Sequence, residues 1–134
     1  MTTHTTVEKL PGEPIAIITH RNPYVPERDI PHAEQELEKY LNETQGPLHV
    51  ITDFSQVNTS FSLLVISMSE AISRQGLASI SSNRIKLVLV GSHRLIELGA
   101  QALQQDQYGG LDVPFFANMD EALAYCRSTI QTVS

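Results

Sequence analysis

The spacing of apolar residues divides this chain into strands and helices. Short runs rich in branched side chains at residues 14–19, 48–52 and 85–90 predict buried strands, and residues 5–10 give a weaker strand signal. Pro11 and Gly12 separate the first two of these segments, which predicts a tight turn and a hairpin. A last short strand is predicted at residues 113–116, where Pro114 is tolerable only at an edge of the sheet.

Four other segments carry apolar residues at helical spacing. After a loop over residues 21–29, Pro31 suits the first turn of a helix that ends before Gly46-Pro47. A second helix is predicted over residues 60–75 with Gly76 as its stop, and a third follows Ser92 as its N-cap. A turn is predicted at residues 108–110, and a fourth helix is predicted to open at Asn118, which resembles the start of a capping box with Glu121. The expected inner faces are Ala33, Leu37, Tyr40 and Leu41, then Phe61, Leu64, Val65, Met68, Ala71 and Ile72, then Leu95, Ile96, Gly99, Ala102 and Leu103, and last Ala122, Leu123, Cys126 and Ile130.

The resulting order is β-β-α-β-α-β-α-β-α. Strands that alternate with helices favour an α/β fold, here a mostly parallel mixed sheet with an antiparallel hairpin strand at its N-terminal end and helices packed on it. At 134 residues the chain is expected to form a single domain over residues 1–134.

Composition and charge narrow the possible functions. The 15 acidic and 9 basic residues give a net charge of −6, and the charges are scattered, which disfavours nucleic acid and anionic membrane surfaces as partners. Cys126 is the single cysteine and stands in an apolar helical pattern, so we expect a buried small side chain rather than a reactive thiol. No secretory signal begins the sequence, and the uncharged segment 61–69 is too short to span a bilayer, so a cytoplasmic location is expected.

Polar residues follow the predicted strands, where α/β sheets usually bind their ligands. They are His20 and Arg21, then Asp53 and Ser55, then Ser92, His93 and Arg94, and last Asn118. His20, Arg21 and residues 92–94 form a possible ligand or anion-binding edge, although simple helix capping is the alternative for residues 92–94. Asp53 has a similar alternative, a hydrogen bond to the backbone of its own turn.

Catalysis is the less favoured class. The histidines show no spacing typical of metal ligands, and the chain has neither a Walker loop nor a nucleophile elbow. We therefore predict no catalytic residue, no metal and no cofactor. Hydrolysis at His93 and Asp53 is the enzymatic alternative.

Several segments resemble the STAS superfamily, the domains of anti-sigma-factor antagonists and sulfate-transporter tails, and more closely its divergent STAS/Sec14-like relatives. Residues 48–57, LHVITDFSQV, are similar to the family's strand that ends in Asp-Leu-Ser-Gly-Val. Residues 85–95 look like its next strand, turn and helix, and residues 113–123, VPFFANMDEAL, like its last strand and a helix opening with Glu-Ala-Leu. The resemblance covers about residues 5–130 and implies a regulatory domain that binds a protein partner.

The antagonists carry a phosphorylated serine within Asp-Ser-Ser-Gly, and this chain departs from that motif. Counted from Val57 without gaps, the motif falls on Phe61, Ser62, Leu63 and Leu64, with Leu63 at the phosphorylated position. A phosphorylation switch is therefore not expected, and Ser60 or Ser62 would be its shifted sites.

Two hypotheses remain. The first is a non-catalytic domain that docks a protein partner or a second copy of itself as a homodimer. Its expected surface comprises Asp53, Ser55, Thr59, Ser60, Phe61, Ser62, Leu63 and Ile66, since Leu63 and Ile66 lie off the apolar stripe of their helix. The second is a carrier or sensor of a small apolar or lipid-like ligand, held between sheet and helices by residues such as Phe61, Met68, Phe115 and Phe116.

Overall fold

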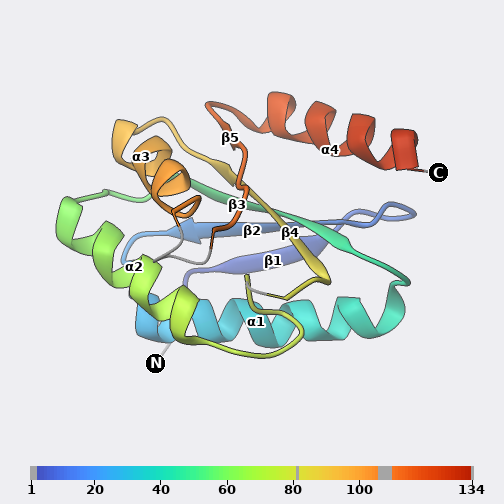
Figure 1. Ribbon diagram of the computed structural model, residues 1–134. Coiled ribbons are helices and arrows are strands. Elements are labelled where there is room, and N and C mark those ends of the chain that lie inside the picture. Colours follow the sequence, from blue (N-terminus) through green and yellow to red (C-terminus); the bar gives the residue numbers. More distant parts are fainter. Residues whose placement is uncertain (1–2, 81, 106–109, 134) are drawn as a thin grey trace.

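The strands and helices of the computed structural model form a mixed sheet with helices on both faces (Figure 1). The structure describes residues 3–80, 82–105 and 110–133. Within these ranges the elements are β1 (Thr6–Lys9), β2 (Ile15–Arg21), α1 (Pro26–Glu43), β3 (Leu48–Gln56), α2 (Phe61–Ser73), β4 (Ile85–Val90), α3 (Arg94–Ala102), β5 (Phe115–Phe116) and α4 (Met119–Val133). The predicted α/β class and the order of elements are confirmed. Of the turn predicted at residues 108–110, only Gly110 is described.

The five described strands lie in the sheet in their chain order. β1 is antiparallel to β2, as expected for the predicted hairpin, and β2 to β5 are parallel to one another. β4 begins and ends at the expected residues. β5 has only two residues and lies at the edge, and Pro114, which has no N–H for a ladder, stands directly before it.

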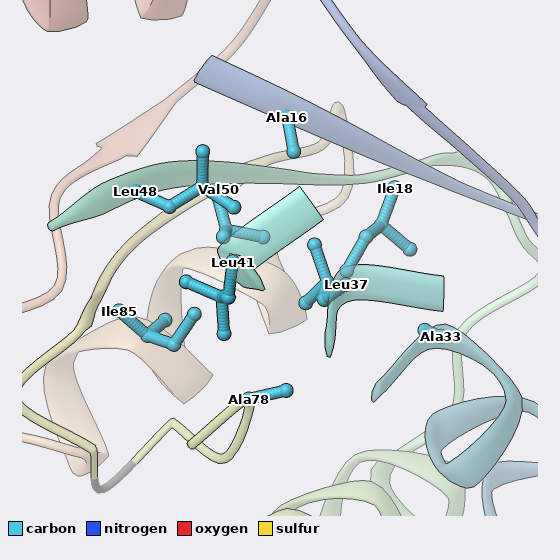
Figure 2. Packing of buried hydrophobic residues seen from close by; sticks show 9 residues of the cluster. All are labelled: Ala16, Ile18, Ala33, Leu37, Leu41, Leu48, Val50, Ala78 and Ile85. Atoms are coloured by element: carbon cyan, nitrogen blue, oxygen red, sulfur yellow. The ribbon is translucent and has the colours of Figure 1, made fainter. Parts of the chain in front are cut away.

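Alternate residues of the strands contribute to cores on opposite faces of the sheet. Figure 2 shows the core beside α1, which contains Ala16, Ile18, Leu48, Val50 and Ile85 from the strands together with Ala33, Leu37, Leu41 and Ala78. The intervening strand residues form the other core with α4, namely Ile15, Ile17, Ile51, Val88, Val90, Ala122 and Cys126. The predicted inner faces of α1 and α4 are thus confirmed.

The first helix starts earlier than the sequence suggests. α1 begins at Pro26, so Pro31 lies inside the helix and residues 26–29 are helical rather than part of the predicted loop. Both prolines could occupy a first turn, where the missing N–H costs nothing. Asp29 makes a contact at this earlier start. Its Oδ2 accepts a hydrogen bond from the backbone N–H of Val25, the residue directly before α1, at 2.8 Å.

The Asp29 carboxylate is completely buried and joins the chain before β1 to α1. Thr3 donates its hydroxyl to Oδ1 at 2.6 Å, and Arg28 Nε donates to the same oxygen at 2.7 Å. Burial alone would raise the pKa of Asp29, but the hydrogen bonds from Arg28, Thr3 and Val25 outweigh it and lower the pKa to about 2. The group is therefore ionised at neutral pH.

The last helix has the N-cap expected at Asn118. Asn118 Oδ1 accepts a hydrogen bond from the Glu121 backbone N–H at 2.9 Å, which caps the N-terminus of α4. Cys126 is completely buried in the core, and burial raises the pKa of its thiol to about 11. The predicted burial of this cysteine is confirmed.

Candidate functional site

The structure distributes the predicted anion-binding residues over different parts of the sheet. His20 and Arg21 belong to β2 rather than to the loop after it, and His20 is only 3% exposed. Arg21 Nη1 donates a hydrogen bond to Thr6 Oγ1 of β1 at 3.1 Å. Ser92, His93 and Arg94 follow β4, which lies two strands away from β2 in the sheet. His20 is thus an interior residue, and the guanidinium of Arg21 is bonded on the β1 side.

Residues 92–94 form the start of α3. The N-cap is His93, whose Nδ1 accepts a hydrogen bond from the Leu95 backbone N–H at 3.1 Å. The expected cap at Ser92 is wrong, because the helix begins one residue later and the extended residue directly before it is His93. The side chains of Ser92, His93 and Arg94 are exposed.

Asp53 and Ser55 lie at the end of β3, which extends to Gln56 and is longer than expected. The Asp53 Oδ1 atom accepts a hydrogen bond from the Ser55 backbone N–H at 2.8 Å. Asp53 therefore bonds its own backbone, as the alternative interpretation expected.

The hydroxyl residues that follow begin α2. Ser60 is its N-cap, and the Ser60 Oγ atom accepts a hydrogen bond from the Leu63 backbone N–H at 3.1 Å. Thr59 donates its hydroxyl to the Val57 carbonyl at 3.3 Å, and Ser62 is exposed. The helix ends at Ser73, three residues before the glycine expected to stop it. Of these three hydroxyls, that of Ser60 serves to cap the helix.

The inner face of α2 differs from the predicted stripe. Leu63, Leu64, Ser67, Met68 and Ala71 face inward, and Leu63 was expected to lie off the stripe. Three residues of the outer face are Phe61, Val65 and Ile66, which are 70%, 45% and 43% exposed. The helix is apolar on most sides, so apolar spacing alone does not define which face turns inward.

The inner face of α2 covers an apolar cavity of about 120 Å³. No residue of α2 is buried, and the helix packs mainly against α1 and α3. The other lining residues include Ile18, Val50, Thr52, Phe54, Leu87 and Leu89 of the sheet, Ala33 and Leu37 of α1, Ile96 and Gly99 of α3, and Ala78 and Ile80 of the connector after α2. Met68 lines this cavity as the ligand hypothesis expected. Phe61, Phe115 and Phe116 are not among its lining residues.

An aromatic cluster of His20, Tyr24 and Phe54 forms part of the cavity wall. The ring centroid of His20 lies 4.6 Å from that of Tyr24 and 5.0 Å from that of Phe54. His20 Nδ1 shares a hydrogen bond of 2.7 Å with Thr5 Oγ1, and the Tyr24 hydroxyl donates to Ser67 Oγ of α2 at 3.1 Å. Burial lowers the pKa of His20 to about 4 and raises the pKa of Tyr24, so both side chains are neutral at physiological pH.

Tyr24 and Ser67 were missed as site residues in the sequence. Tyr24 stands in a proline-rich segment that predicted only a loop, and Ser67 is one of several serines in its helix. Their hydrogen bond joins residues 43 positions apart in the chain, which local spacing does not reveal.

The C-terminal end of α2 is held by charge. Arg74, the C-cap residue, donates from Nε to Glu34 Oε1 of α1 at 2.8 Å and from Nη1 to Glu70 Oε1 at 3.3 Å. On the α3 side, Gly99 allows close approach of the two helices, since a Cβ atom there would lie 2.7 Å from Leu64 Cδ1. The described contacts thus attach α2 to α1 and α3, and the cavity lies between α2 and the sheet.

None of the described helices is long and apolar enough to cross a membrane. Over the same residues, no group of three or more His, Cys, Asp or Glu side chains is arranged to hold a metal ion.

Comparisons of the chain with models of protein families, with curated proteins and with solved structures give no match.

Proposed function

We propose that this protein is a non-catalytic binding domain that holds a small apolar ligand in the cavity beneath α2. The observation that carries this proposal is an apolar helix with no buried residue above a cavity of about 120 Å³. Natural protein interiors are close-packed, so space of this size beneath an apolar helix favours an occupant. An engineered apolar cavity of about 150 Å³ in another protein stays dry and binds benzene. The expected ligand is therefore about the size of one benzene ring.

Filling the cavity tests the proposal. Toluene is expected to raise the melting temperature of the natural protein, because a ligand that binds only the folded state stabilises it. Ala71 lines the cavity from α2, and Ala71→Leu should abolish the response to toluene. The same substitution should raise the free energy of unfolding by about 1 kcal/mol, because the new side chain occupies empty apolar space.

Ala124→Leu is the matched control, since Ala124 is an exposed residue of α4, which packs on the other face of the sheet. It should leave the response to toluene intact. A natural protein whose melting temperature does not change with toluene would contradict the proposal. A response that survives Ala71→Leu would place the ligand elsewhere.

The outer face of α2 supports a second function, docking of a protein partner or of a second copy. Phe61, Val65 and Ile66 expose apolar surface on the helix where the STAS resemblance expects the partner. On this proposal the chain is a STAS-like regulatory domain of the cytoplasm that acts without the phosphorylation switch. The cavity and the outer face lie on opposite sides of one helix, so a ligand below α2 and a partner above it are compatible.

Light scattering after size-exclusion chromatography tests whether two copies of the chain associate. The natural chain of 14.8 kDa is expected to elute at twice this mass, and the double variant Phe61→Ser, Ile66→Ser at the single mass. Leu98→Ser is the control, because Leu98 is an exposed apolar residue of α3, 41% accessible. A natural protein that stays at the single mass at every concentration would exclude self-association.

A further inference from the structure

The cavity has no positive charge to offer a ligand. Among the described residues that line it, none is Lys or Arg. Its single lining carboxylate is Glu34, which is already paired with Arg74 at 2.8 Å. An ionised ligand would lose its hydration without gaining a counter-charge, and such a transfer is strongly unfavourable. The lining therefore favours a neutral molecule.

His20 supplies a polar atom for such a molecule. The residue is 3% exposed and lines the cavity, and its Nδ1 is engaged by Thr5 Oγ1 at 2.7 Å. No described residue makes a hydrogen bond to the other ring nitrogen, Nε2. The His20 ring also packs against Tyr24 and Phe54, at centroid distances of 4.6 and 5.0 Å. Nε2 has no partner among the described residues in a wall that is otherwise largely apolar, and a ligand hydroxyl would supply one.

We propose that the cavity selects a neutral molecule of one aromatic or alicyclic ring that carries a hydroxyl group. The ring fills the apolar space beneath α2, and the hydroxyl forms a hydrogen bond with Nε2 of His20. A hydroxyl both donates and accepts, so it matches Nε2 in either tautomer of the neutral imidazole. The inference rests on the proposed binding of an apolar ligand in this cavity.

Three ligands of similar shape separate the possibilities in titration calorimetry of the natural protein at pH 7.5. Benzyl alcohol should bind about tenfold more tightly than toluene, which fills the same space but leaves Nε2 unpaired. Benzoate should bind at least about 100-fold more weakly than benzyl alcohol, because its charge finds no counter-ion.

Two leucine variants then identify the polar contact. His20→Leu should remove the preference for benzyl alcohol over toluene. His49→Leu should keep this preference. His49 is a half-buried residue of β3, and its neighbours Leu48 and Val50 contribute to the core on the cavity side. Because side chains alternate along a strand, His49 faces the other side of the sheet.

Each outcome decides one question. Failure of all three ligands to bind would overturn the proposed function and this inference with it. Toluene that binds as tightly as benzyl alcohol, or benzoate of comparable affinity, would overturn the inference and leave the apolar cavity as the binding site. A preference that persists in His20→Leu would remove His20 from the contact. The comparison of the three ligands in the natural protein stands even if His20→Leu does not fold.

Discussion

Replacement of Asp29 by Ala is expected to lower the free energy of unfolding by about 3 kcal/mol. The carboxylate is fully buried and accepts hydrogen bonds from the Thr3 hydroxyl, the Val25 backbone N–H and the Arg28 guanidinium. Its removal leaves the N–H at the start of α1 without a partner and detaches residue 3 from the helix. Urea unfolding at pH 7, followed by far-ultraviolet circular dichroism, measures the loss.

Two further variants test the reason for this loss. Glu27→Ala removes an exposed acid from the same first turn and should cost less than about 0.5 kcal/mol. Asp29→Asn keeps an acceptor oxygen but loses the charge, so its stability should lie between those of the natural protein and Asp29→Ala. If Asp29→Ala costs no more than Glu27→Ala, the network does not stabilise the fold.

The Asp29 contribution should depend on pH only in strong acid. The pKa of Asp29 is about 2 in the folded protein, below its value of 3.8 in the unfolded chain. The native state therefore binds fewer protons between these values, and the stability due to this group is complete above pH 3.8 and is lost as the pH falls towards 2.

His20 is expected to make the protein less stable as the pH falls from 7 to 4. Burial lowers the pKa of His20 to about 4 from 6.5 in the unfolded chain, and the negative charges of Asp29 and Asp53 oppose this only in part. Between these values the unfolded chain binds more protons than the folded protein, so stability falls as the pH is lowered through the window. The difference corresponds to a loss of about 3 kcal/mol, measured by urea unfolding at a series of pH values.

His20→Gln separates this effect from the other titrating groups. Burial and Lys86 lower the pKa of His49, which adds a loss of stability in acid, whereas burial raises the pKa of Glu34, which has the opposite effect. These groups are unchanged in His20→Gln. The loss of stability between pH 7 and 4 should therefore be about 3 kcal/mol smaller in this variant than in the natural protein. Identical pH profiles for the two proteins would show that His20 does not remain neutral in the folded state.

Much of the fold could be predicted because local patterns and long-range packing agree in it. Residues 85–90 are rich in branched apolar side chains and lie between Arg84 and Gly91, and β4 has these limits. The cap at Asn118 and the spacing of Ala122 and Cys126 likewise define α4 and its buried face. In such segments the sequence has one favourable arrangement, so the prediction is specific.

The remaining features depend on contacts that the local pattern does not contain. Pro26 and Pro31 are equally suited to a first turn, and the start of α1 coincides with a carboxylate bonded to residue 3. The face of α2 that turns inward depends on α1 and α3, because both sides of this helix are apolar. His20 looked like a residue of the loop after its strand, and only its contacts with Thr5, Tyr24 and Phe54 reveal a buried, neutral ring.

The two edges of the sheet also limit how copies of this protein could assemble. β1 has four residues and includes Glu8 and Lys9, and β5 has two residues and is preceded by Pro114. A strand from another molecule would find only a short row of free N–H and C=O groups at either edge. Extension of the sheet from one molecule into the next, the first step towards fibrils, is therefore disfavoured, and association in solution is left to the helical layers.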